Sequence, residues 1–325
     1  MSGQLASTLG SQAGAVPLAD LGSNLILLLV LVVVFFGTAV GFFTYAGSGI
    51  GTRPVDRAEG APGARRPDDF TEFAGRQPLP RDLEELAPGV WRLSGWPPNA
   101  FNIYLIEAPG IETEATDRGE IRDVGPPAVL VDAGTRYSAR RILRGLHAHP
   151  LAALMLTHAH PDHQGASALV CQLRDIPLWC GAGDADAVES GRIETLVPER
   201  GWNRRLARFL AGPAHPVKRR LREGEHVGPF VVLETPGVSP GHISLWRESD
   251  GVLIAGDVAV NQHPVLGRPG LYEQPQRFVA DPVRNRESLQ RLAELRPEIV
   301  GFGHGPPLRD PDALAELVAS ITPTR

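Results

Sequence analysis

The densest group of reactive side chains follows the apolar run Leu151–Leu156. Three histidines and an aspartate stand within six residues there: His158, His160, Asp162 and His163. A buried strand would deliver them onto a loop at a sheet edge, with the first two turned toward one point and the last two toward a second. Neutral imidazoles and a carboxylate suit zinc, iron or manganese. So many polar groups would be costly to bury without a metal or one another, and we interpret the stretch as a metal-binding loop.

Three further candidates stand singly at the ends of predicted strands, inside glycine-rich turns. They are His242, Asp257 and His304. Flanking glycines let the backbone turn sharply and approach a bound group closely. One isolated histidine is more often an ordinary polar residue, but three such positions downstream of the first cluster favour a common site.

The complete series resembles the ligand set of the metallo-β-lactamase superfamily of hydrolases, and the resemblance covers residues 89 to 325. It implies an αββα sandwich with the site at one edge. It also implies two metal sites, one held by His158, His160 and His242 and the other by Asp162, His163 and His304. By the same resemblance Asp257 bridges the two metals. The resemblance also implies that Asp132, at the end of an early strand, lies near the site and orients the metal ligands without binding metal itself.

Differences within that superfamily favour hydrolysis. Oxygen-reducing diiron members usually carry Glu where His160 stands, and true β-lactamases lack the bridging aspartate found here as Asp257. Glyoxalase II-like thioesterases share the ligand set but add a helical domain that binds glutathione. Only 21 residues follow His304, so we expect that domain to be absent.

The chemistry implied is attack by a metal-bridging hydroxide on an ester, thioester, lactone or phosphoester. Two divalent ions, zinc with iron or manganese as alternatives, would lower the pKa of a shared water from about 15.7 to about 7. Asp162 would bind metal and align the hydroxide. His263 and Tyr272 are candidates on the substrate side, although an ordinary loop role fits them better. The alternative function is an iron-dependent oxidoreductase acting on sulfur compounds in the same fold.

Composition and periodicity fit a layered α/β domain. The 325 residues are 42% hydrophobic with a net charge of −5, which argues against a nucleic-acid binder. Two cysteines form no disulfide framework and match no zinc pattern, so we expect ordinary buried thiols. Strands are predicted at 90–93, 102–106, 129–132, 151–156, 177–180, 231–234, 244–246, 252–255 and 299–302, and helices at 138–147, 166–174, 284–295 and 312–321. The sequence carries no signal for an oligomeric state.

The N-terminal quarter differs from the rest of the chain in composition. Residues 1–23 are expected to be a disordered tail, and 24–46 a single transmembrane helix, because the 21 residues of 25–45 carry no charge. A helix of that length spans roughly 31 Å, which matches the hydrocarbon core of a bilayer. Residues 47–88, rich in Pro, Gly and Arg, are expected to be a linker, with a helical turn at 81–86 as the only candidate element.

The charge flanking that span predicts its orientation. No Lys or Arg precedes it, whereas Arg53, Arg57, Arg65 and Arg66 follow it. By the positive-inside rule the catalytic domain then lies in the cytoplasm, tethered to the cell membrane.

The stretch 200–222 contains eight basic residues and no acid. One hypothesis is a basic amphipathic cap that meets an anionic small-molecule substrate or the anionic membrane surface. The other is a solvated helix face.

Overall fold

The computed structural model describes residues 83–111, 126–146, 149–198 and 201–321. The predicted disordered tail, the predicted membrane span at 25–45 and most of the predicted linker lie outside these residues. Within the described part of the chain, no helix combines the length and the apolar character needed to cross a bilayer.

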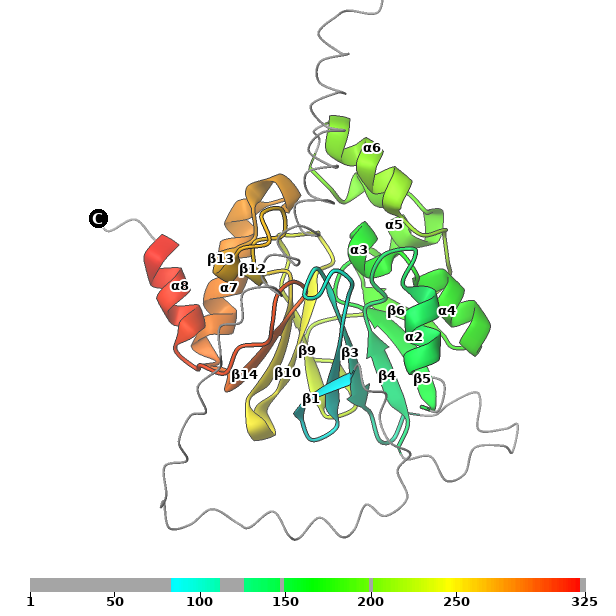
Figure 1. Ribbon diagram of the computed structural model, residues 1–325, viewed down its shortest axis with the longest axis horizontal. Helices are drawn as coiled ribbons and strands as arrows, with labels where there is room; N and C mark the ends of the chain where they lie inside the picture. Colours follow the sequence, from blue (N-terminus) through cyan, green and yellow to red (C-terminus); the bar gives the residue numbers. More distant parts are fainter. Residues whose placement is uncertain (1–82, 112–125, 147–148, 199–200, 322–325) are drawn as a thin grey trace, which may run out of the picture. The chain divides into compact units, whose positions relative to one another are not determined.

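The first sheet has seven strands in sequence order (Figure 1). They are β1 (Leu83–Ala87), β2 (Val90–Ser94), β3 (Asn102–Glu107), β4 (Ala128–Val131), β5 (Leu151–Leu156), β6 (Leu178–Gly181) and β7 (Val217–Leu221). The pairs from β1 to β4 are antiparallel, and those from β4 to β7 are parallel. The parallel half therefore needs crossover helices, which cover its outer face.

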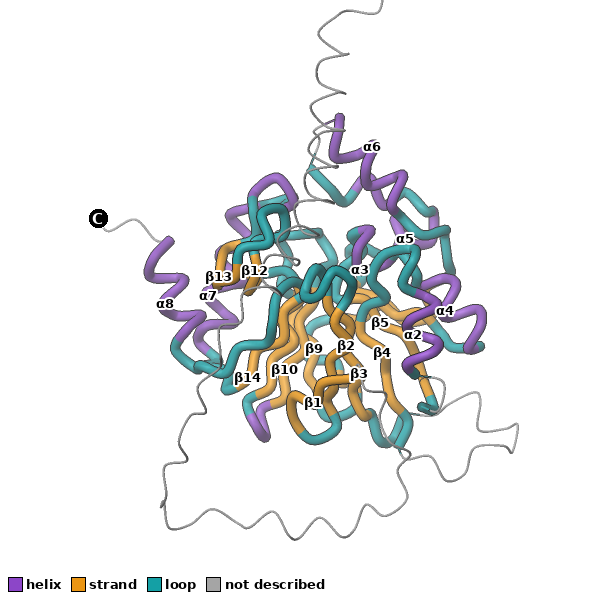
Figure 2. Tube along the Cα trace, in the orientation of Figure 1, coloured by secondary structure: helices purple, strands orange, loops and turns teal. Residues whose placement is uncertain are grey.

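The second sheet has five strands in the order β14-β11-β10-β9-β8. They are β8 (His226–Val227), β9 (Phe230–Glu234), β10 (Ile243–Arg247), β11 (Val252–Gly256) and β14 (Ile299–Phe302). Only the β11–β14 pair is parallel among them. A separate hairpin, β12 (Ala259–Gln262) and β13 (Pro269–Glu273), follows β11 and projects beside the second sheet (Figure 2).

Helices flank both sheets. The chain forms α2 (Ala139–Gly145), α3 (Pro161–Gln164), α4 (Ser167–Arg174), α5 (Ala185–Ser190), α6 (Gly201–Leu210), α7 (Pro282–Glu294) and α8 (Ala313–Ile321). Short 3-10 turns lie at Ile193–Thr195, Glu248–Asp250 and Gln276–Phe278. Helices α2, α4 and α5 contribute to the core on the first sheet, and α7 and α8 to the core on the second. The predicted αββα sandwich is thereby confirmed.

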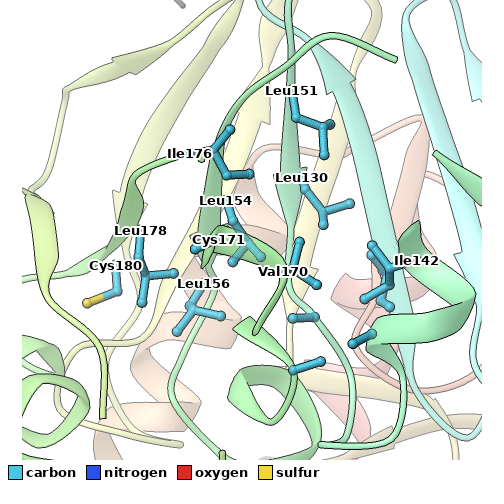
Figure 3. Close-up of a cluster of buried hydrophobic side chains, with 14 of the residues drawn as sticks. Leu130, Ile142, Leu151, Leu154, Leu156, Val170, Cys171, Ile176, Leu178 and Cys180 are labelled. Carbon is cyan, nitrogen blue, oxygen red and sulfur yellow. The ribbon is translucent and has the colours of Figure 1, made fainter. Parts of the chain in front are cut away.

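Alternation along the strands builds this layering, because successive side chains of a strand point to opposite faces. On β4, Leu130 joins the core under α2 and α4, while Val129 and Val131 join the core between the sheets. Leu154 and Leu156 of β5 likewise face the helices, and Figure 3 shows them beside side chains of α4. A strand buried on both faces must be apolar throughout, and this is why β5 could be predicted from sequence.

One predicted boundary is wrong. Leu83–Ala87 is an edge strand paired with β2, not a linker or a helical turn, so the sheet begins before residue 89. Its two consecutive glutamates obscured the pattern. In the fold, Glu84 faces outward and forms an ion pair with Arg92 of β2 at 2.6 Å. The strand is therefore stabilised by a neighbour that a local reading of 81–88 does not include.

Candidate metal centre

The seven candidate ligands come from four loops at one edge of the sandwich. The first four follow β5 and continue into α3, a single turn with Pro161 at its start. His242 directly precedes β10, and Asp257 and His304 follow the ends of β11 and β14. Since β11 and β14 are parallel neighbours, their carboxyl ends deliver both residues to the same place.

The structure brings one expected ligand set together completely. Ligand atoms of Asp162, His163 and His304 all lie within 4.8 Å of one another. A second group, formed by His158, His163 and Asp257, meets the same limit. Asp257 lies between the two groups, because its Oδ2 is 3.2 Å from His304 Nε2 and 3.7 Å from His158 Nε2. That position suits the bridging role implied by the resemblance.

The other expected set is brought together less closely. The ring centroids of His160 and His242 lie 4.6 Å and 5.0 Å from that of His158. However, His242 Nε2 accepts a hydrogen bond from the backbone N–H of Asp257 at 3.0 Å, and its Nδ1 lies 2.8 Å from Thr235 Oγ1. His242 would have to release the Nε2 bond to bind a cation.

Unpartnered buried atoms provide the test of whether a metal fits. The Nε2 atoms of His158, His160 and His163 and the Oδ1 atom of Asp257 are buried and have no hydrogen-bond partner among the described residues. Buried polar atoms are nearly always satisfied, and leaving several together unsatisfied is costly. Three imidazole nitrogens and a carboxylate oxygen are also the donors that zinc, iron and manganese accept. The residues therefore fit a metal centre.

Asp132 supports the candidate metal centre by hydrogen bonds to Thr157 and His163. It has a left-handed backbone with φ of 65°, and its carboxylate accepts hydrogen bonds from the N–H and the hydroxyl of Thr157, each at 2.8 Å. Its Oδ2 is also 2.9 Å from His163 Nδ1. An acceptor there keeps the proton on Nδ1 and leaves Nε2 free to bind a metal.

Burial and the neighbouring carboxylates shift the pKa values of the clustered histidines in opposite directions. Burial lowers the pKa of His158, and burial also lowers that of His242 to about 3. Burial opposes protonation of His304 as well, but the charge of Asp257, its hydrogen bond to the ring and the charge of Asp162 together raise the pKa of that imidazole to about 9. His163 behaves in the same way, with Asp257 and then Asp132 raising its pKa against the effect of burial. The carboxylates therefore favour the protonated, positively charged form of His163 and His304. A bound metal cation would supply that positive charge in place of the protons.

Arg92 and Asn102 hold the turn that carries His304, and sequence reasoning missed both. The amide of Asn102 donates to the carbonyls of Phe302 and Gly305, at 2.8 and 2.6 Å. The buried guanidinium of Arg92 also donates to the Gly305 carbonyl, at 3.3 Å. The ring of His304 is fixed in addition by a contact between its Nδ1 and the carbonyl of Ala100.

Asp184 was also missed, and it ties two ligand loops together. Its fully buried carboxylate accepts hydrogen bonds from the N–H of Ala159 at 2.9 Å, the hydroxyl of Ser239 at 2.7 Å and the N–H of Gly241 at 2.7 Å. Ala159 lies between the first two histidines, and Gly241 directly precedes His242. Burial raises the pKa of Asp184, although the three hydrogen bonds oppose that effect.

The two substrate-side candidates lie in the β12–β13 hairpin and make local contacts. His263 Nδ1 accepts from the N–H groups of Val265 and Leu266, each at 3.2 Å, and the Tyr272 hydroxyl donates to the carbonyl of Pro269. The two rings pack edge to face at 5.8 Å. These contacts make both residues part of the hairpin's own structure.

The basic stretch 200–222 is not one amphipathic helix. It divides between α6 and β7, and the arginines of β7 are paired with acids. Arg220 contacts Asp186 and Glu189 at 2.8 Å, and Arg219 contacts Glu225 at 3.1 Å.

Both cysteines are buried, as predicted. Cys171 lies on α4 and Cys180 on β6, and both belong to the core beneath α2, α4 and α5 (Figure 3). Burial raises the pKa of the Cys171 thiol to about 12. The thiols therefore contribute to packing and take no part in the metal centre.

Comparison with known proteins agrees with this geometry. The family model of the metallo-beta-lactamase superfamily matches residues 124–304. The chain is 31% identical over 212 residues to the probable metallo-hydrolase YflN of Bacillus subtilis (strain 168), covering 58% of this chain and 79% of that protein. It is 29% identical over 180 residues to a hydroxyacylglutathione hydrolase of Bdellovibrio bacteriovorus, covering 54% of this chain and 57% of that one.

Among solved structures, a beta-lactamase domain protein from Burkholderia ambifaria superposes with a TM-score of 0.51 at 27% identity, covering 76% of this chain and 79% of that one. The sandwich, the converging ligands and these matches lead to one conclusion. The chain belongs to the metallo-beta-lactamase superfamily.

Proposed function

We propose that this protein is a binuclear metal-dependent hydrolase that acts on ester or thioester bonds. The observation that carries the proposal is the group of buried, unpartnered nitrogen and oxygen atoms that converge from separate loops. The similarity to a hydroxyacylglutathione hydrolase favours thioesters among the possible substrates.

The ligands would divide as the family resemblance implies. His158, His160 and His242 would hold one ion, Asp162, His163 and His304 would hold the other, and Asp257 would contact both. When bound, such ions supply a water of lowered pKa and a Lewis acid for the carbonyl oxygen. Zinc suits this set of imidazoles and carboxylates, and iron or manganese could use it too.

The chain's own residues define the open side of the site. The Asp162 side chain is 39% exposed, whereas those of His163, Asp257 and His304 are at most 6% exposed. Substrate and water therefore approach past Asp162, whose carboxylate can align a water by accepting its proton in a hydrogen bond. The buried ligands behind it are shielded from solvent, which strengthens their electrostatic effect on a reacting carbonyl.

The test is a hydrolase panel on the full-length chain loaded with zinc. We expect thioester or ester hydrolysis that is abolished by chelation and restored by zinc. His304→Ala should remove activity, and His226→Ala, at an exposed histidine of β8, should not. A protein that binds two metals yet cleaves no thioester, ester, lactone or phosphodiester would refute the proposal. Oxygen uptake in the presence of sulfur compounds would instead support the iron-dependent oxidoreductase.

We further propose that residues 25–45 tether the hydrolase to the membrane, with the catalytic domain in the cytoplasm. The support is the charge-free, membrane-length stretch and the arginines that follow it. Carbonate extraction of membranes tests the tether. The full-length chain should stay in the pellet, and a chain lacking 25–45 should be released. Release of both would refute the anchor.

A further inference from the structure

Gln274 lies against Asp257, the candidate bridging ligand, although the two residues are 17 positions apart in sequence. The β12–β13 hairpin begins two residues after Asp257 and returns with Glu273 paired to Ala259. The next residue, Gln274, is thereby placed beside Asp257 and is only 3% exposed. Its Nε2 donates a hydrogen bond to Asp257 Oδ2 at 2.7 Å.

The orientation of this amide is determined by its partner. A carboxylate only accepts hydrogen bonds, so an amide turned the other way would place two acceptors against each other in a buried position. The NH2 group must therefore face Asp257. The amide oxygen, Oε1, then points away from it, and it is buried without a hydrogen-bond partner among the described residues.

The hairpin has a separate attachment to the fold. Glu273, next to Gln274, accepts two hydrogen bonds from Arg286 of α7, at 2.7 and 3.0 Å. The side chain of Gln274 is therefore not required to hold the hairpin against α7, and its hydrogen bond fixes the Asp257 carboxylate instead.

We propose that Gln274 is a positioning residue, whose NH2 group orients the Asp257 carboxylate between the two ligand groups. This inference rests on the proposed metal centre, in which Asp257 would contact both ions.

The test measures metal binding and needs no turnover. Full-length chains carrying Gln274→Met are compared with the wild type in Co2+ binding by chelator competition and in the visible spectrum of bound Co2+. Loss of a partner of a metal ligand typically weakens metal binding about 10- to 100-fold. We expect a loss of that size and a shifted absorption band. Gln276→Met, the same substitution at an exposed position two residues further on, should match the wild type.

The two possible failures are distinguishable. Unchanged Co2+ affinity and spectrum in Gln274→Met would overturn the positioning role. If the chain hydrolyses nothing, the proposed function fails, and the Co2+ measurements still decide whether Gln274 positions Asp257.

Discussion

Replacing Asp184 tests whether one buried carboxylate holds two ligand loops in place. Asp184→Ala removes the acceptor of three buried donors, on Ala159, Ser239 and Gly241. Each donor left without an acceptor costs about 1–3 kcal/mol. For three donors we therefore expect the free energy of unfolding to fall by about 3–9 kcal/mol. That is a large part of the free energy of unfolding of a typical domain, about 5–15 kcal/mol.

Asp184→Asn provides a graded version of the same experiment. The amide oxygen can take the place of Oδ2 and still accept from Ala159 and Ser239, but the NH2 group then faces the N–H of Gly241. The N–H of Gly241 is then left without an acceptor, so we expect the free energy of unfolding to fall by about 1–3 kcal/mol. A metal ion at the proposed site of His158, His160 and His242 should also bind about 10- to 100-fold more weakly, because the loops that carry these ligands are released.

Urea unfolding of the metal-free chain and chelator competition with zinc measure the two effects. Asp186→Asn is the matched control, since Asp186 lies two residues away with an 85% exposed side chain paired to Arg220. Exposed pairs contribute little, so its unfolding free energy should change by less than about 1 kcal/mol. If Asp184→Asn and Asp186→Asn gave the same unfolding midpoint and the same zinc affinity, the reasoning would be refuted.

Three further outcomes are expected. Gly303→Ala should abolish metal binding, because its Cβ would lie 1.9 Å from a carboxylate oxygen of Asp257, while Gly145→Ala, with open space around its Cβ, should bind metal normally by elemental analysis. Arg92→Met should lower the unfolding free energy by about 1–3 kcal/mol, since it leaves the buried Oδ1 of Asn102 without the guanidinium donor and removes one of the two donors to the Gly305 carbonyl; a change below about 0.5 kcal/mol in urea unfolding would contradict this. Cys171 should resist iodoacetamide at pH 8 in the native chain and react in urea, as detected by mass spectrometry, because burial raises its pKa to about 12. The thiol's raised pKa gives a contribution to stability that is complete below the unfolded pKa of about 8.5 and is lost as the pH rises toward 12, so denaturation in urea should become easier over that range.

The sequence predicted the features that depend on local pattern. β5 is apolar on both faces because it is covered on both, and its six consecutive apolar residues indicate a buried strand. Asp162 and His163 follow it within one turn of α3, so their convergence needed no knowledge of the rest of the fold. β1 gave no such signal, since its outward glutamates interrupt the pattern and its stability comes from pairing with β2.

The residues that support the metal centre were beyond sequence reasoning for a different reason. Asp184 receives hydrogen bonds from residues 25, 55 and 57 positions away, and Asn102 donates to carbonyls about 200 positions away. Nothing in Gly-Ala-Gly-Asp-Ala, the stretch around Asp184, distinguishes it from an ordinary surface turn. Only the fold reveals that this aspartate is buried and that its donors belong to the ligand loops.

A common rule connects Asp132, Asp184 and Gln274. Each is a buried polar side chain that contacts a candidate ligand or the loop that carries it, and each comes from an element other than the ligand's own. Metal sites assembled from separate loops need such support, because four loops held only by a cation would each lose conformational entropy on binding it. The chain fixes the loops before any metal arrives. Metal affinity should therefore be as sensitive to substitutions at these three residues as to the loss of a single peripheral ligand, and parallel measurement of zinc affinity in Asp132→Asn, Asp184→Asn and His242→Ala would decide the point. If both aspartate variants bound zinc as tightly as the wild type while His242→Ala did not, the loops would have to be organised by the metal itself.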